Sequence, residues 1–270
     1  MTIHTEVYKP PLFIMRGTKS NMAFAADLRD LFNKKYYQNF ECSAVIAAAG
    51  TSQRMGSEDK LFMELLGVPV LAHTLIAYQN CAAINEIVIV TREESIARVN
   101  EICVKYSISK AAKVTAGGSK RLDSVINGVF AVSSGAKLIA IHDGARPCIE
   151  CSDIEAAVKA AGKFNAAAPA VKVIPTIKRV INGVIIETVN REDLVEIQTP
   201  QVFDADLIKA SLTKARKESV NVTDDCSAVE LLGFPVRITN GSVSNIKITS
   251  MDDIVIAEAI LRKRHSECKM

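Results

Sequence analysis

The chain of 270 residues contains no tryptophan, and aromatic residues make up only 5% of it. It therefore offers few platforms on which unpaired bases could stack, which disfavours a nucleic-acid-binding protein. An excess of one charge is also missing, because 33 basic residues oppose 30 acidic ones and the formal net charge is +3. Any positive field must be local, which suits a small anionic substrate.

Long apolar runs are absent too, and none reaches the ~18 residues of a membrane span. The first residues lack the apolar core of a signal peptide. Seven cysteines, an odd number scattered over a long chain, predict reduced thiols in a cytoplasmic protein. Cys148 and Cys151 form a lone C-x-x-C, and only four histidines exist, so a zinc site is disfavoured and a redox pair remains the alternative to two ordinary thiols.

Hydrophobic residues make up 49% of the chain, enough for a full core. From Ser43 onward, strand-like and helix-like segments alternate, which predicts an α/β fold with a doubly wound, mostly parallel sheet. Two apparent capping boxes, Thr91-x-x-Glu94 and Ser152-x-x-Glu155, mark helix starts. The predicted strands are 43–48, 86–91, 111–115, 137–142, 166–173 and 245–249, and the predicted helices are 70–80, 94–106, 121–133, 152–163, 204–217, 224–232 and 251–263.

Two segments depart from this alternation. Residues 1–41 form an N-terminal extension, helical over 23–37 or loosely ordered, before a domain that spans 42–270. Within that domain, Asn182-Gly183 separates two β-branched runs, which is a strong hairpin signal. The hairpin belongs to an arm at about 172–192, which we expect to project and to serve dimerisation, because exposed apolar strands need a partner to cover them.

The loop AAAGTSQRMGSEDK at 47–60 follows the first predicted strand. Gly50 lets the backbone turn and approach a ligand, successive N–H groups form an anion-binding nest, and Arg54 and Lys60 add positive charge. Neither a Walker loop nor G-x-G-x-x-G is present, which disfavours the two more familiar phosphate-binding folds. The loop predicts a nucleoside triphosphate site, the alternative being an ordinary surface loop.

Ligands of doubly wound sheets bind beyond the carboxyl ends of the strands. The loops after residues 48, 115 and 142 should therefore share one edge, which brings together Gly50–Lys60, Gly117–Ser124 and Asp143–Arg146. Each polar residue also has a simpler interpretation. Lys247 could be a solvated strand residue, Arg146 a structural ion pair and Asp224 a helix cap; Asp225 stays open, and His142 is given no catalytic role.

Five further segments add specificity to the loop at 47–60. They are GGSKRLDSV at 117–125, HDGARP at 142–147, QTPQ at 198–201, TDDCSAVE at 223–230 and NIKIT at 245–249. In this order and spacing the chain resembles the 2-C-methyl-D-erythritol 4-phosphate cytidylyltransferase family over roughly residues 42–264. The family loop often has a second glycine where Ser52 stands, which is the one departure.

The resemblance implies a Rossmann-like nucleotidyltransferase that joins CTP to 2-C-methyl-D-erythritol 4-phosphate and releases pyrophosphate, with Mg²⁺ as cofactor. It implies that arm residues reach the site of the other subunit in a homodimer. It also implies the following roles: Ala48, Ala49, Gly50, Gly118, Arg121 and Ser124 bind the nucleotide; Asp143, Arg146, Thr176 and Thr199 bind the polyol phosphate; Arg54, Lys60, Arg191 and Lys247 are catalytic; and Asp143 is a candidate metal ligand.

The attacking phosphate oxygen is already mostly ionised near neutral pH, because its second pKa is about 6. The reaction therefore needs no general base; it needs two polyanions to be positioned and their charge neutralised. A ribitol-5-phosphate cytidylyltransferase, which would differ only in its polyol contacts, remains an alternative. A non-catalytic nucleotide-binding protein is the alternative of another class, although it would be expected to lose Arg54, Lys60 or Lys247.

Overall fold

The computed structural model describes residues 41–50 and 59–267. The expected N-terminal helix, Ser52 and Arg54 lie outside the described residues. None of the helices in the described part has the length and hydropathy of a membrane span.

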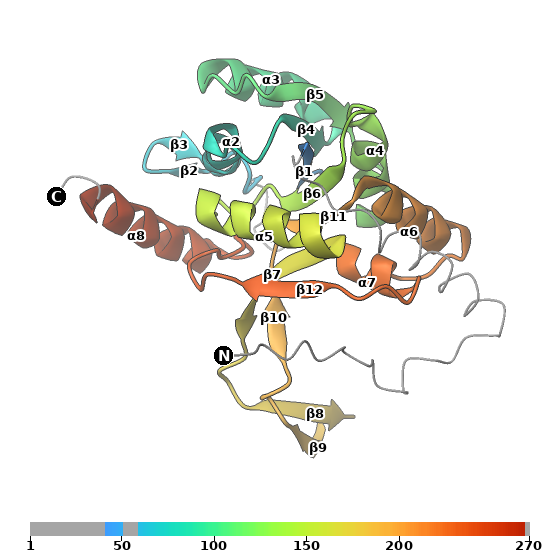
Figure 1. Ribbon diagram of the computed structural model, residues 1–270. Helices are drawn as coiled ribbons and strands as arrows, with labels where there is room; N and C mark the ends of the chain where they lie inside the picture. Colours follow the sequence, from blue (N-terminus) through green and yellow to red (C-terminus); the bar gives the residue numbers. More distant parts are fainter. Residues whose placement is uncertain (1–40, 51–58, 268–270) are drawn as a thin grey trace, which may run out of the picture.

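A single mixed sheet forms the centre of the fold (Figure 1). Its order is β10-β7-β11-β6-β1-β4-β5, and β12 pairs with the other edge of β7. The strands from β6 to β5 run parallel, which confirms the predicted α/β architecture, while β11 runs antiparallel to both its neighbours. The bounds are β1 Cys42–Ala48, β4 Glu86–Thr91, β5 Ala111–Ala116, β6 Leu138–Asp143, β7 Ala166–Lys172, β10 Val195–Ile197, β11 Gln201–Asp204 and β12 Arg237–Asn240.

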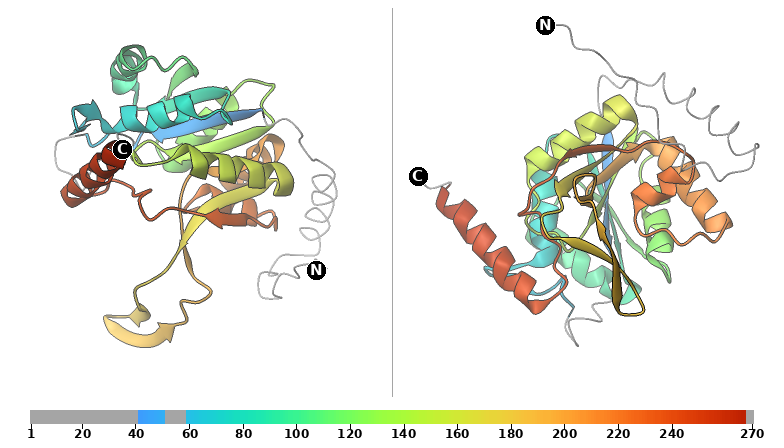
Figure 2. Two further views of the ribbon diagram at one scale, coloured as in Figure 1. Left: turned by 60° about the vertical axis from the view of Figure 1, so that its left-hand side comes forward. Right: turned by 90° about the horizontal axis from the view of Figure 1, so that it is seen from below.

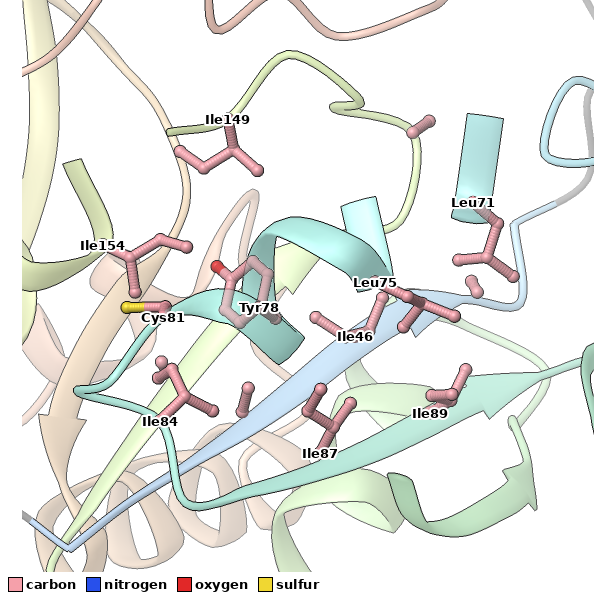
Figure 3. Close-up of a cluster of buried hydrophobic side chains, with 14 of the residues drawn as sticks. Ile46, Leu71, Leu75, Tyr78, Cys81, Ile84, Ile87, Ile89, Ile149 and Ile154 are labelled. Atoms are coloured by element: carbon pink, nitrogen blue, oxygen red, sulfur yellow. The ribbon is translucent and has the colours of Figure 1, made fainter. Parts of the chain in front are cut away.

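Helices cover both faces of this sheet (Figures 1 and 2). Alternate residues of β1 belong to different core clusters. Ile46 is in the cluster that includes Leu75 and Tyr78 of α2 (Figure 3). Val45 is in the cluster on the other face, with Val129 of α4. This alternation is what a strand buried on both sides requires. The helices are α2 Val70–Asn80, α3 Ile96–Lys105, α4 Arg121–Ala131, α5 Cys151–Phe164, α6 Ala205–Lys217, α7 Asp225–Glu230 and α8 Met251–Glu267, with a 3-10 turn, η3, at Glu93–Ser95.

Three local predictions are wrong. Thr91 ends β4 and donates its hydroxyl to the Ala48 carbonyl, so it caps no helix. Ser152 lies inside the first turn of α5, whose N-cap is Glu150. Residues 245–249 form no strand, because their backbone bonds to loops instead: the N–H of Ile248 donates to the Ala145 carbonyl at 2.8 Å.

The predicted hairpin is present as β8 (Ile177–Ile181) and β9 (Val184–Val189), a separate two-stranded sheet that projects from the body (Figure 2). Asn182 and Gly183 have φ values of 49° and 80°, as a two-residue turn of type I′ demands. Its apolar side chains are largely exposed, from Ile186 at 51% to Val184 at 63%. A second small hairpin, β2 (Glu64–Leu65) with β3 (Val68–Pro69), leads into α2.

Candidate active site

Strand register brings the predicted loops to one edge of the sheet. Ala47 lies opposite Asp143, Ala48 opposite Thr91, and Thr91 opposite Ala116. The segments that begin with Ala49, Gly117 and Gly144 therefore leave the sheet side by side. The expectation that these loops share an edge is confirmed.

On one side of this edge the backbone approaches very closely. A Cβ atom on Gly117 would lie 2.6 Å from the Ala49 Cβ and 2.7 Å from the Ser124 Oγ, and one on Gly118 would lie 2.3 Å from the Asp123 Cβ. The Gly118 N–H donates to the Ser124 Oγ at 3.0 Å. Glycine is thus required at both positions for the turn to close against α4. Ala49, Gly118 and Ser124 are brought together as predicted.

Gly50 behaves differently from these two glycines. It is exposed, its φ lies outside the left-handed region, and a Cβ there would meet nothing within 4 Å. No described contact requires glycine at this position. The requirement for Gly50 therefore stays a prediction about ligand approach.

Arg121, at the start of α4, is held by a buried carboxylate. Its guanidinium donates to both oxygens of Asp225, at 2.9 and 2.7 Å, and Asp225 is only 1% exposed. The pKa of Arg121 is raised above its ordinary value, chiefly by the charge of Asp225. The Oε1 of Gln201 in turn accepts the N–H groups of Asp225 and Cys226, both at 2.9 Å. This polar bridge attaches the start of α7 to the start of α4.

The helix that follows Thr223 is capped as expected. Asp224 accepts from the Ser227 N–H at 2.9 Å, and the Ser227 hydroxyl completes a capping box. The function of Asp225, left open by the sequence, is the pairing with Arg121.

On the other side of the edge, Asp143 organises two cations. Its Oδ2 lies 2.9 Å from the Lys247 Nζ and 3.4 Å from the Arg146 Nε. Burial alone would raise the pKa of Asp143, but Lys247, Arg146 and Arg121 outweigh burial and hold that pKa well below its usual range. Asp143 is therefore ionised at neutral pH and holds the Lys247 ammonium beside its carboxylate.

The segment that carries Lys247 is tied to the β6–α5 loop and to Lys60. Arg146, 7% exposed, donates to the Asn245 carbonyl at 2.7 Å. The Lys60 Nζ donates to the Ile248 carbonyl at 2.9 Å. Lys60 and Arg146 thus both bond to the short segment that contains Lys247.

Thr199 lies directly behind Asp143. Its Oγ1 accepts the Asp143 N–H at 3.2 Å and lies 2.9 Å from the Nδ1 of His142, which is fully buried. Burial lowers the pKa of His142 to about 3, although Asp143 acts in the opposite direction, so its ring is neutral at physiological pH. His142, Gln201 and Asn245 were not predicted as site residues, although each lies in a segment that carries the resemblance: HDGARP, QTPQ or NIKIT.

Thr176 and Arg191 are not brought to this site by a single chain. Both are exposed and lie in the arm, where Arg191 donates to the Ile174 carbonyl. Neither has a described contact with Asp143 or Lys247. Their predicted roles require the arm to reach another copy.

Metal ligands are sparse at this edge. Within residues 41–50 and 59–267, no three His, Cys, Asp or Glu side chains converge on one point. Both ion pairs of Asp143 use its Oδ2, so its Oδ1 could serve as one oxygen ligand. A single carboxylate fits Mg²⁺, which takes most of its ligands from phosphates and water.

Cys148 and Cys151 contact different carbonyls, of Ala257 and Ala77, and burial raises the pKa of each thiol.

Comparisons with known proteins agree with this geometry. A family model described as 2-C-methyl-D-erythritol 4-phosphate cytidylyltransferase matches residues 42–263. A protein of that name from Halalkalibacterium halodurans is 44% identical over 225 residues, which are 83% of this chain and 98% of the relative. One from Dehalococcoides mccartyi is 40% identical over 228 residues, which are 84% of this chain and 99% of the relative.

Solved structures show the same likeness. The 4-diphosphocytidyl-2C-methyl-D-erythritol synthase of Anaerococcus prevotii superposes with a TM-score of 0.74 at 32% identity, covering 83% of this chain and 97% of that one. The Thermus thermophilus 2-C-methyl-D-erythritol 4-phosphate cytidylyltransferase superposes with a TM-score of 0.70 at 29% identity, covering 83% of this chain and all of that one.

Proposed function

Because this chain belongs to the 2-C-methyl-D-erythritol 4-phosphate cytidylyltransferase family, it transfers CMP from CTP to 2-C-methyl-D-erythritol 4-phosphate, and we propose that the residues gathered around Asp143 perform this transfer. The products are 4-diphosphocytidyl-2-C-methyl-D-erythritol and pyrophosphate. The observation that supports the assignment of residues is that Lys247 and Arg146 both pair with Asp143, while Lys60 bonds to the segment to which Lys247 belongs.

The nucleotide lies on the glycine side of the edge. Backbone groups of Ala48, Ala49 and Gly118 and the Ser124 hydroxyl recognise cytosine and its ribose. A side chain at Gly117 or Gly118 would collide with the protein itself, so both positions are glycine and present only backbone atoms. A planar base can approach the backbone of this turn directly. Arg121, anchored by Asp225, borders the same turn with its charge fixed in place.

The acceptor phosphate lies on the Asp143 side. Its oxygen attacks the α-phosphorus of CTP while the bond to the departing pyrophosphate breaks, so charge must be neutralised on both reactants. Lys247, only 40% exposed and held by Asp143, positions the attacking phosphate. Lys60, together with Arg54, stabilises the triphosphate. Mg²⁺, which Asp143 would help to hold, supplies further neutralisation when bound.

Release of pyrophosphate from CTP tests the acceptor. We expect release in the presence of Mg²⁺ with 2-C-methyl-D-erythritol 4-phosphate and little with ribitol 5-phosphate offered in parallel. A preference for ribitol phosphate would keep the fold and the nucleotide site but contradict the acceptor. If a folded sample that binds CTP released no pyrophosphate with either acceptor, the result would contradict the proposed transfer.

We also propose that the arm mediates a homodimer in which Thr176 and Arg191 of each chain complete the partner's site. The exposed apolar residues of β8 and β9 support this, because an isolated two-stranded sheet with such side chains needs a covering surface. The local contacts of Arg191 support it as well, since they leave the residue outside its own chain's site.

Mixed dimers give a direct test of this arrangement. Arg191→Ala and Lys247→Ala are each expected to be nearly inactive alone. Co-expressed, they should form heterodimers in which one site regains both residues and the other lacks both. The isolated heterodimer should therefore recover about half of the wild-type turnover, and the unseparated product of random pairing about a quarter. Separate affinity tags isolate the heterodimer. A heterodimer as inactive as its parents, or a monomer in sedimentation, would contradict the arm model.

A further inference from the structure

We propose that His142 is a positioning residue for the acceptor half of the site, acting through Thr199 on Asp143. This inference rests on the proposed function, because the acceptor phosphate is placed beside Asp143. His142 would touch neither substrate. Its effect would be to fix the hydroxyl that anchors the backbone of Asp143.

The contacts form a short chain from the core to the site. His142 is on β6 with no exposed surface, and its Nδ1 lies 2.9 Å from the Thr199 Oγ1. The same oxygen accepts the Asp143 N–H at 3.2 Å. Asn245 completes the support, because its Nδ2 donates to the Thr199 carbonyl at 2.9 Å. Thr199 is thereby tied at its side chain to β6 and at its backbone to the segment that carries Lys247.

Stability alone does not account for a histidine here. Within the described part of the chain its buried Nε2 has no hydrogen bond of ordinary geometry, although the Arg146 backbone lies close enough to the ring to raise the pKa of His142. The hydroxyl of Tyr78, whose ring centroid lies 5.0 Å from that of His142, is also buried without a partner. A buried polar atom without a hydrogen bond lowers the stability of the fold, so its presence needs an explanation. An apolar residue of similar size could not make the 2.9 Å contact with the Thr199 hydroxyl.

Small displacements at this point have large consequences. Asp143 positions Lys247, and the alignment of two reacting phosphates depends on cations held to within fractions of an ångström. A Thr199 hydroxyl free to rotate would release one constraint on the Asp143 backbone. The CTP side, built from Gly118 and Ser124, shares no described contact with His142.

Two substitutions separate positioning from packing. Asparagine at 142 keeps an amide near the place of Nδ1, whereas leucine is similar in size but offers Thr199 nothing. We expect His142→Leu to lower kcat/KM for the acceptor ~10–100-fold, the range typical of a misplaced reacting group, with KM for CTP changed less than about twofold. His142→Asn should recover most of the activity. Tyr78→Phe removes a partnerless hydroxyl and is the control, with kinetics unchanged.

Wild-type turnover in the same assay keeps this test distinct from that of the proposed function. Inactive wild-type protein would overturn the function itself. With active wild type, an unaffected His142→Leu variant would overturn the inference alone. Equal losses in the leucine and asparagine variants, accompanied by a lower Tm, would also overturn it, because packing would then explain both.

Discussion

Replacement of Lys247 by alanine is expected to lower kcat/KM ~10²–10³-fold, which is the usual loss when one preorganised charge contact to a reacting group is removed. Lys247 is half-exposed and its segment belongs to no helix or strand, so its charge contributes little to the core. Asp143 keeps its ion pair with Arg146 in the variant and is not left uncompensated. The free energy of unfolding should therefore change by less than about 1 kcal/mol.

Steady-state kinetics and urea unfolding measured on the same preparation decide this prediction. Lys159, exposed on α5, provides a matched lysine far in the sequence from the site, and Lys159→Ala should change neither quantity. If Lys247→Ala lost stability in proportion to its loss of activity, the residue would be structural. If activity survived in a folded variant, the acceptor phosphate would have to be positioned by other groups.

Much of the fold followed from the sequence because the sheet is buried on both faces. A strand such as β1 must then read as a nearly continuous apolar run, and a helix between two such runs must bring the next strand back parallel. The shared edge of the loops after β1, β5 and β6 follows from that topology, so the neighbourhood of Ala49, Gly118 and Asp143 could be predicted without coordinates.

The predictions that failed depended on contacts between distant segments. Thr91-x-x-Glu94 has the spacing of a capping box, but tertiary contacts place Thr91 in the sheet, where its hydroxyl bonds to the Ala48 carbonyl. The β-branched run at 245–249 has the pattern of a strand, yet it forms isolated hydrogen bonds instead of a ladder. The Ile248 N–H donates to the Ala145 carbonyl, and the Asn245 carbonyl accepts from the Arg146 side chain. The strands β11 and β12 gave no alternating pattern long enough to recognise.

The partners of two buried polar residues near the site could not be predicted from the sequence either. Gln201 and His142 are buried polar side chains whose partners, Asp225 and Thr199, are 24 and 57 positions away along the chain. Both residues lie in segments that support the resemblance, HDGARP and QTPQ, but these segments do not reveal the partners, and only coordinates show the contacts. For Thr176 and Arg191 the situation is reversed. The resemblance implies roles for both, but within one chain they lie in the arm and make no described contact with Asp143 or Lys247.

Arg121→Ala is expected to lower the free energy of unfolding by about 2–3 kcal/mol, because it strands the carboxylate of Asp225 inside the protein. Removal of one partner from a fully buried pair typically costs more, but the Arg121 side chain is 37% exposed, so water can reach part of the vacated space. Urea unfolding measures the change, and the change should show as a lower midpoint at unchanged slope.

The control is an arginine whose ion pair is exposed. Arg262 pairs with Glu258 on the surface of α8 and is 68% exposed, so Arg262→Ala should cost less than about 0.5 kcal/mol. The double variant Arg121→Ala/Asp225→Ala should recover part of the loss seen in Arg121→Ala, since the stranded charge is then gone. Recovery would be partial, because the double variant still lacks the ion pair between the starts of α4 and α7, although alanine keeps the backbone N–H that donates to Gln201. Two outcomes would contradict this prediction. One is an equal loss of unfolding free energy in Arg121→Ala and Arg262→Ala, and the other is a double variant that is clearly less stable than Arg121→Ala. Either would show that water solvates the Asp225 carboxylate and that its pairing with Arg121 adds nothing to stability.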